Sequence, residues 1–184
     1  MKAPWVSVIG WSGSGKTALL THLVSVLRQR GLTVAAVKHS SDGHGLHKPG
    51  SDTEALEKAG AAPVGLATPA GVQLTFPGET AAALPAMLES LAPEADLVLV
   101  EGWKDGPFPK IEVWRKELGP LIATGRSDVL AVVTDELLPH HFRRFSAAAV
   151  PELADFLTQW VAERVRASHR DSAERDISPL TPED

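Results

Sequence analysis

The apolar positions of the chain fall into two kinds of block that alternate along its length. Short runs of bulky apolar residues are typical of strands buried in a parallel sheet, and between them apolar residues recur at helical spacing. Strands are expected over 5–9, 33–38, 63–68, 71–76, 97–100, 111–114 and 129–134, and helices after residue 17, between Ser51 and Gly60, over 79–91 and over 151–165. The alternation predicts an α/β fold, a mostly parallel sheet flanked by helices.

Two of these runs, 63–68 and 71–76, are expected to form a short antiparallel excursion, because little more than a turn joins them. Short exposed strands of this kind can pair across a two-fold axis, so the hairpin is the surface we expect for dimerisation. Ser51 and Glu54 have the spacing of a capping box at the start of the helix that precedes the hairpin.

The length of 184 residues predicts one compact domain, which we place at 1–166. The segment 167–184 is polar, carries mixed charge and contains Pro179 and Pro182, so it is expected to be a disordered tail. The chain has no cysteine, which excludes disulfides, thiolate zinc sites and a cysteine nucleophile. The net charge of -5 and the lack of a long apolar run argue against nucleic-acid and membrane partners, and a cytoplasmic location is expected.

The strongest chemical signal follows the first strand. Residues 10–17, GWSGSGKT, fit the pattern G-x-x-x-x-G-K-[ST] and are followed by a helical segment. In this phosphate loop, glycines let backbone N–H groups turn toward a phosphate, the lysine reaches the β- and γ-phosphates, and the threonine hydroxyl ligates Mg²⁺. The residues expected to contact the nucleotide here are Gly10, Ser12, Gly13, Ser14, Gly15, Lys16, Thr17 and Ala18. The fold is therefore expected to be P-loop NTPase-like.

Acidic residues at two later positions are candidates for the same site. Glu101 ends the apolar run 97–100, and ligands of open α/β sheets bind at the carboxyl ends of the strands, so Glu101 is expected to face the Mg²⁺ beside Thr17. Asp135 follows the strand at 129–134. It either pairs with a guanine base or belongs to a plain turn.

Basic and histidine side chains offer two further possibilities. His39, His44 and His47 fall in one stretch, which is either a polar loop near the phosphates or a metal site, although their spacing matches no specific metal motif. Separately, local charge suggests a second anion site, for which the candidates are Lys38, His39, Lys48, Lys104 and Lys110.

Several segments together resemble the molybdopterin-guanine dinucleotide biosynthesis adaptor protein B family over residues 5–134. Besides the phosphate loop they are Lys38-His39, KPGSDT at 48–53, KAGA at 58–61 and LVEGWK at 99–104. The resemblance implies a GTP-binding homodimer with weak GTPase activity that assists a guanylyltransferase in attaching GMP to molybdopterin. It also implies that Lys16 and Glu101 act on the nucleotide, and that Thr17, Asp52 and Glu101 hold Mg²⁺.

The chain departs from common nucleotide-binding patterns in three places. The guanine signature N-K-x-D is absent, Trp11 stands where related dimeric NTPases often carry a lysine, and Ala18 lacks the hydroxyl that often follows the motif threonine. No glutamine or arginine suited to hydrolysis is evident, so slow turnover is expected. Two other functions stay open: a small-molecule kinase that uses ATP, and a metallochaperone-type GTPase.

Overall fold

The chain folds into two compact units, each described here by itself. The computed structural model describes residues 3–40, 46–76, 84–91 and 94–176. One unit comprises Met1–His39 and Ala92–Asp184, and the other comprises Ser40–Leu91. The predicted hairpin forms a sheet of its own and adds no strand to the larger sheet. The single domain expected over 1–166 stays a prediction.

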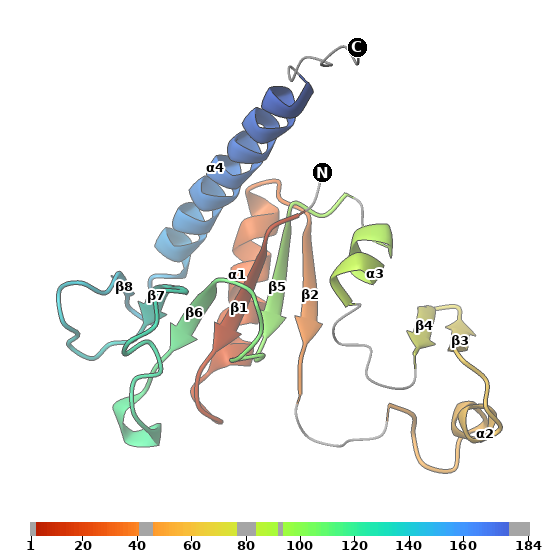
Figure 1. Cartoon of the computed structure of the whole chain (residues 1–184). Coiled ribbons are helices and arrows are strands. Elements are labelled where there is room, and N and C mark those ends of the chain that lie inside the picture. The colour runs from red at the N-terminus through yellow and green to blue at the C-terminus, as the bar shows by residue number, and fades with distance from the viewer. Residues whose placement is uncertain (1–2, 41–45, 77–83, 92–93, 177–184) are drawn as a thin grey trace, which may run out of the picture. The chain divides into compact units, whose positions relative to one another are not determined.

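The first unit is built on a six-stranded sheet in which every neighbouring pair is parallel (Figure 1). Its strands, in spatial order, are β2 (Val34–Lys38), β5 (Leu97–Glu101), β1 (Trp5–Ile9), β6 (Lys110–Val113), β7 (Val129–Val133) and β8 (Arg144–Phe145). The five strands expected here from apolar runs are confirmed to within a residue or so at each end. Strand β8 was missed because two residues are too short to give a pattern.

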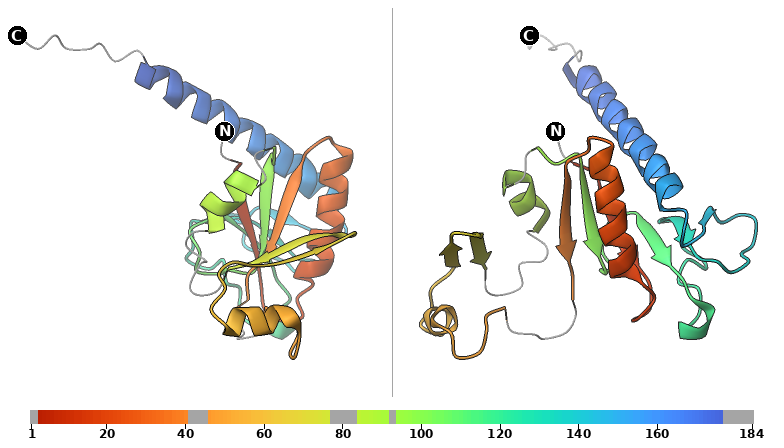
Figure 2. Two further views of the ribbon diagram at one scale, coloured as in Figure 1. Left: turned by 90° about the vertical axis from the view of Figure 1, so that its right-hand side faces the viewer. Right: turned by 180° about the vertical axis from the view of Figure 1, so that it is seen from behind.

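Two helices lie on the same face of this sheet (Figure 2). They are α1 (Lys16–Gln29) and α4 (Val150–Asp176), and a single turn of 3₁₀ helix, η2 (Lys116–Leu118), lies between β6 and β7. Each helix buries an apolar stripe at helical spacing, Leu19, Leu23 and Leu27 on α1 and Leu153, Leu157 and Val161 on α4. These stripes form the core together with apolar side chains of the central strands.

Helix α4 continues to Asp176, so it extends past Arg166, where a disordered tail was expected to begin. The residues from 167 to 176 are polar but contain several good helix formers and neither glycine nor proline. A segment of this composition can prolong an existing helix without burying an apolar face. Low hydrophobicity was therefore a poor guide to disorder over these ten residues, and residues 177–184 lie outside the described part of the chain.

The second unit contains α2 (Asp52–Lys58), β3 (Val64–Thr68), β4 (Gly71–Thr75) and α3 (Leu84–Leu91). Strands β3 and β4 pair antiparallel, which confirms the expected hairpin. The first half of the capping box is confirmed, since Ser51 Oγ accepts from the backbone N–H of Glu54. The Glu54 carboxylate accepts at 2.7 Å from the N–H of Gly50, one residue before the N-cap, and not from that of Ser51. Helix α3 confirms the end of the helix expected over 79–91, whose first residues are not described.

None of the helices, over the residues described, combines the length and the apolar character that crossing a membrane requires.

A buried ammonium group holds the segment after β5 against the connection between β6 and β7. Lys110 is 0% exposed, and its Nζ donates to the carbonyl oxygens of Gly106 (2.9 Å) and Phe108 (2.6 Å) and to Asp128 Oδ2 (2.8 Å). The Arg126 guanidinium, and after it Lys110, hold the pKa of Asp128 well below its usual range. The suggestion that Lys110 offers its charge to a bound anion is therefore wrong, because that charge is used inside the fold.

Replacing Asp128 by asparagine is expected to lower the free energy of unfolding by about 2 kcal/mol, because the buried ammonium of Lys110 loses its counter-charge. Urea denaturation followed by circular dichroism measures this. The matched control is Asp105→Asn, which removes a carboxylate that is 81% exposed and 3.7 Å from Arg126. It is expected to change stability by less than ~0.5 kcal/mol.

The pH dependence of the free energy of unfolding, measured for the native chain and for Asp128→Asn, tests whether the negative charge of Asp128 is responsible. Because the folded-state pKa of Asp128 is lowered, its contribution is fully present above the unfolded pKa of about 4 and is lost as pH falls toward the folded value. The difference between the native chain and Asp128→Asn should thus stay constant from pH 7 to pH 5 and shrink at lower pH. A difference that vanished between pH 7 and pH 5 would contradict this assignment.

Candidate functional site

The phosphate loop leaves the carboxyl end of β1 in a conformation that only glycine tolerates at its key positions. Gly10, Gly13 and Gly15 have φ values of 147°, 77° and 97°. A Cβ on Gly10 would overlap the carbonyl oxygen of Val113 on the neighbouring strand. The motif glycines thus serve both the turn of the backbone and its close approach to β6.

The loop opens directly into α1 and leaves the start of this helix uncapped. Gly15 occupies the N-cap position, no side chain caps the helix, and its first turn has no acidic residue. The ammonium of Lys16 folds back to the carbonyl oxygens of Gly10 (3.0 Å) and Trp11 (2.9 Å). An uncapped helix start beside a lysine is an arrangement that suits a phosphate group.

Thr17, in the first turn of α1, contacts Glu101, the last residue of β5. Glu101 ends β5 and pairs in register with Val8 of β1, and Thr17 Oγ1 donates to Glu101 Oε2 at 2.9 Å. On the other side, Lys38 ends β2 and its Nζ lies 4.0 Å from Glu101 Oε1. Glu101 therefore lies next to Thr17, as expected, and the ammonium of Lys38 lies close to the same carboxylate.

The turn after Glu101 depends on a further glycine. Gly102 has a φ of 87°, and a Cβ there would lie 2.7 Å from the carbonyl oxygen of His39. The next residue, Trp103, has a φ of 59°, and its ring stacks on the imidazole of His39 with 4.8 Å between centroids and 6° between planes. This stacking fixes the ends of β2 and β5 beside one another.

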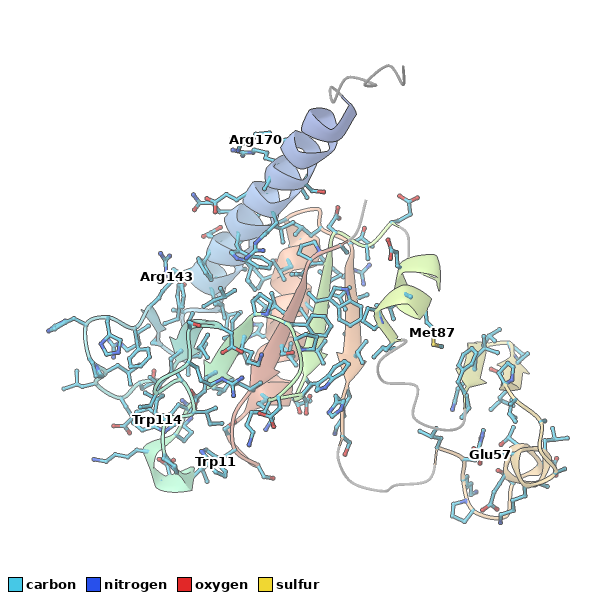
Figure 3. All side chains as sticks on the ribbon, in the orientation of Figure 1. Trp11, Glu57, Met87, Trp114, Arg143 and Arg170 are labelled. Carbon is cyan, nitrogen blue, oxygen red and sulfur yellow. The ribbon has the colours of Figure 1, made fainter. Side chains whose placement is uncertain are left out.

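Trp11 fastens the phosphate loop to the β6–β7 connection, which the sequence alone did not indicate. Its indole Nε1 donates to the carbonyl oxygen of Pro120 at 2.8 Å, and a Cβ on Gly119 would lie 2.7 Å from its ring. The indole of Trp114 donates to the carbonyl oxygen of Gly119 at 2.9 Å. Figure 3 shows Trp11 and Trp114 at the same end of the first unit.

The same connection is held from inside by Glu112. This residue is 0% exposed, and its carboxylate accepts from the backbone N–H groups of Ile122 (2.8 Å) and Ala123 (2.7 Å). Burial raises the pKa of Glu112, and these two hydrogen bonds act in the opposite direction. A glutamate between the apolar residues Ile111 and Val113 was the sequence signal that could have revealed this role.

Asp135 and Thr134 lie just after β7, at the carboxyl edge of the sheet, and both shape the local backbone. Asp135 Oδ1 accepts from the N–H of Ala147 at 2.9 Å, and Thr134 Oγ1 accepts from the N–H of Glu136 at 3.1 Å. These two contacts hold the backbone bend at residues 135–136. Pairing of Asp135 with a base is not tested by these contacts.

The remaining candidates are distributed between the two units. Asp52 is the first residue of α2 in the second unit, so its expected role at the metal stays a prediction. His39 belongs to the first unit, His47 to the second, and His44 lies outside the described residues. Within the described part of the chain, no group of three or more histidine, aspartate and glutamate residues is placed to hold a metal ion.

The arrangement fits a nucleoside phosphate with its Mg²⁺. The glycine cradle, the uncapped start of α1 and Lys16 supply the groups that a triphosphate needs, and Thr17 with Glu101 supplies oxygen donors, which Mg²⁺ prefers. Ser14 Oγ is buried beneath the loop and makes no hydrogen bond to any described residue.

Replacing Trp11 by phenylalanine is expected to raise amide hydrogen-exchange rates at residues 11–15 by about fivefold. The variant keeps a ring but loses one hydrogen bond, worth about 1 kcal/mol, that holds the loop. Exchange followed by mass spectrometry measures this. The matched control, Trp5→Phe, removes an indole at the opposite end of β1 and should leave these rates unchanged; equal effects of the two variants would contradict the tether.

Comparisons with known proteins identify the family of the chain. The family model of molybdopterin guanine dinucleotide synthesis protein B matches residues 5–135. A molybdopterin-guanine dinucleotide biosynthesis adapter protein of Haemophilus influenzae is 34% identical over 163 residues, covering 86% of this chain and 89% of that protein. The Escherichia coli adapter protein is 31% identical over 166 residues, covering 88% and 95%.

Comparison with solved structures points to the same family. The crystal structure of a molybdopterin-guanine biosynthesis protein B matches with a TM-score of 0.65 and 28% identity, covering 86% of this chain and 99% of that one. The P-loop NTPase-like fold and the expected family resemblance are thereby confirmed. Because the family model matches well over half of the chain and the relatives agree with it, the chain belongs to the molybdopterin guanine dinucleotide synthesis protein B family.

Proposed function

We propose that this protein is a GTP-binding adapter that assists a guanylyltransferase in converting molybdopterin to its guanine dinucleotide form, with weak GTPase activity of its own. Family membership supports the place in this biosynthesis, since the matched relatives are named as its adapter proteins. The observation that carries the nucleotide part is the hydrogen bond between Thr17 and Glu101 next to the glycine loop, whose carbonyl oxygens hold the ammonium of Lys16.

Different residues of the site bind the phosphates and the Mg²⁺ ion. Lys16 and the backbone of the glycine loop bind the phosphates, and Thr17 and Glu101 hold Mg²⁺. Asp52, in the second unit, keeps its predicted metal role only as an implication of the family resemblance. The Mg²⁺ ion neutralises charge on the β- and γ-phosphates when it is bound. Lys38, which already faces Glu101, adds positive charge at the same edge.

Asp135 is our candidate for reading the guanine base. A carboxylate can accept from N1 and N2 of guanine at once, and Asp135 follows a strand at the edge where the phosphate loop begins. One of its oxygens already accepts from Ala147, which fixes the orientation of the carboxylate.

The partners that we propose are the guanylyltransferase, molybdopterin and a second copy of this chain. The hairpin β3–β4 remains our candidate for the dimer surface. Two apolar side chains on it are well exposed, Val72 at 73% and Leu74 at 49%. We propose a cytoplasmic location.

The kinase alternative gains no support from the arginines that would build a lid. Arg126 binds Asp128 at 2.9 Å, Arg143 stacks over Phe156, and Arg144 donates to the carbonyl oxygen of Glu136. These contacts hold the three guanidinium groups within the first unit. The metallochaperone alternative likewise lacks a cluster of metal ligands within the described residues.

The first expected result is a preference for GTP over ATP in the presence of Mg²⁺, of at least about tenfold. Fluorescence of Trp11, which lies in the phosphate loop, reports binding, and calorimetry checks it. Lys16→Ala is expected to abolish binding of both nucleotides, because the ammonium that reaches the phosphates is lost. A preference for ATP would contradict the adapter assignment and favour the kinase.

Asp135→Asn separates base recognition from folding. The asparagine keeps an oxygen that can accept from Ala147, so stability should change little, while pairing with N1 and N2 of guanine is weakened. We expect GTP affinity to fall by about tenfold with ATP affinity unchanged. Equal changes for both nucleotides would remove Asp135 from base recognition.

Hydrolysis of GTP by the isolated chain is expected to be slow, well under about 1 per second, because Arg126, Arg143 and Arg144 are held by other contacts and no water-positioning glutamine is evident in the sequence. A phosphate-release assay measures this, with Lys16→Ala as the control for contaminating activity. Turnover faster than this limit in the native chain, absent from Lys16→Ala, would show that the chain holds a complete hydrolytic site.

A further inference from the structure

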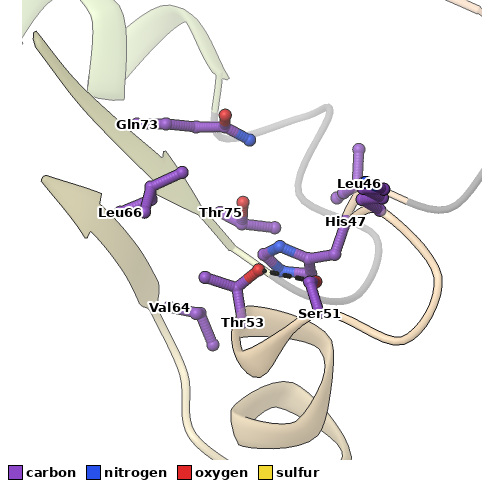
Figure 4. A pocket seen from close by; sticks show the side chains of 9 residues that line it. Leu46, His47, Ser51, Thr53, Val64, Leu66, Gln73 and Thr75 are labelled. Atoms are coloured by element: carbon purple, nitrogen blue, oxygen red, sulfur yellow. Dashed lines mark hydrogen bonds between the residues drawn. The ribbon is translucent and has the colours of Figure 1, made fainter. Parts of the chain in front are cut away.

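The second unit contains a cavity of about 290 Å³ between the hairpin and the segment around the start of α2 (Figure 4). Val64 and Leu66 of β3 give it an apolar wall, Leu46 adds a third apolar side chain, and the other lining side chains are polar. Its volume is at the small end of the ~300–1,000 Å³ range of ligand pockets. The cavity therefore suits a molecule of one or two rings better than a nucleoside triphosphate.

A buried histidine extends into this cavity with a nitrogen that lacks a partner. The side chain of His47 is 5% exposed, and its Nε2 makes no hydrogen bond to any described residue. The carboxylate oxygen Oε2 of Glu57 lies 3.9 Å away, too far for a hydrogen bond. Figure 4 shows the imidazole directed toward Thr53 and Thr75. A buried polar atom without a partner is costly, so a ligand atom bonded to Nε2 would stabilise the site.

The other polar groups around the cavity can recognise a ring edge that both donates and accepts. Gln73 supplies an amide, and Thr53 and Thr75 supply hydroxyl groups, each able to act in either direction. Ser51 is already engaged, since its hydroxyl accepts from the N–H of Glu54 and lies 3.0 Å from Thr53 Oγ1.

The charge around the cavity favours an anion. Lys48 is part of its lining, and no carboxylate is among the described lining residues. The nearby carboxylate of Glu54 is committed to Lys58 at 2.9 Å and to the backbone of Gly50. The carboxylate of Glu57 lies 3.9 Å from His47 Nε2 but outside the lining. An anionic group on the ligand would thus meet Lys48 with no carboxylate of the described lining against it.

We propose that this cavity binds a pterin that carries an anionic group, with His47, Thr53, Gln73 and Thr75 around the ring and Lys48 at the anion. A pterin is a flat two-ring heterocycle whose edge carries both donors and acceptors, which matches the apolar wall and the mixed polar lining. This inference rests on the proposed function. It assigns the molybdopterin ligand to a cavity of the second unit, which is lined by residues between 46 and 75, whereas the phosphate loop spans residues 10–17.

The test uses the full chain and pterin-6-carboxylate as the probe, with binding followed by the fluorescence anisotropy of the pterin. Lys48→Gln and Gln73→Ala change exposed side chains of the lining and are each expected to weaken binding at least tenfold. His47→Gln is expected to weaken it similarly. The matched control for charge is Lys58→Gln, an exposed lysine of the same unit outside the lining, which should leave the affinity unchanged.

Two further measurements test separately the role of the anionic group and the independence of the cavity from the GTP site. Neutral 6-hydroxymethylpterin should bind about tenfold more weakly than the carboxylate and should be insensitive to Lys48→Gln. Adding GTP with Mg²⁺ should not displace the probe, because the two ligands occupy different sites. Displacement by GTP, no binding of the carboxylate at millimolar concentration, or equal effects of Lys48→Gln and Lys58→Gln would each overturn the proposal.

A GTP titration of the same samples distinguishes this inference from the function on which it rests. GTP binding without pterin binding would refute the cavity assignment and leave the adapter function standing. Absence of both would count against both. Pterin binding that depends on His47 and Lys48 but occurs without GTP binding would support the cavity and refute the GTP-dependent function.

Discussion

Strand β1 has a parallel neighbour on each side, β5 and β6, and its hydrogen bonds to these neighbours determine where the glycine loop emerges. Parallel pairing brings the carboxyl ends of neighbouring strands to one edge. Glu101 can therefore meet Thr17 although 84 positions separate them in the chain. The same pairing sets Gly10 so close to Val113 that no side chain fits there. A shift of β1 against either neighbour would disrupt the loop and the acidic group together.

The phosphate loop is held from outside as well as from its own strand. Trp11 reaches the segment at Gly119 and Pro120, and Glu112 holds the backbone two residues farther on from within the core. A large indole at the second loop position thus has a clear structural use in this chain. Where related dimeric NTPases often carry a lysine, this chain has an indole that is hydrogen-bonded within the first unit.

Local patterns in the sequence predicted the parts of the site that depend on backbone conformation. The glycines and Lys16 form a contiguous motif, and Glu101 follows an apolar run, so simple rules for parallel sheets place both at one edge. The tether of Trp11 was out of reach because its partner lies 109 positions away and accepts through a backbone carbonyl, which any residue could supply. Lys110 was misjudged because sequence offers no sign that a lysine is completely buried, whereas its three acceptors come from turns that only the fold brings together.

The connection between β6 and β7 also restricts how sequences of this kind can diverge. Its backbone is bonded at Gly119 and Pro120 to two indoles and at Ile122 and Ala123 to one carboxylate, all within five positions. An inserted or deleted residue between Val113 and Ala123 would move at least one of these bonding groups out of reach. Relatives that keep a tryptophan in the loop and a glutamate in β6 should therefore keep the length of this connection.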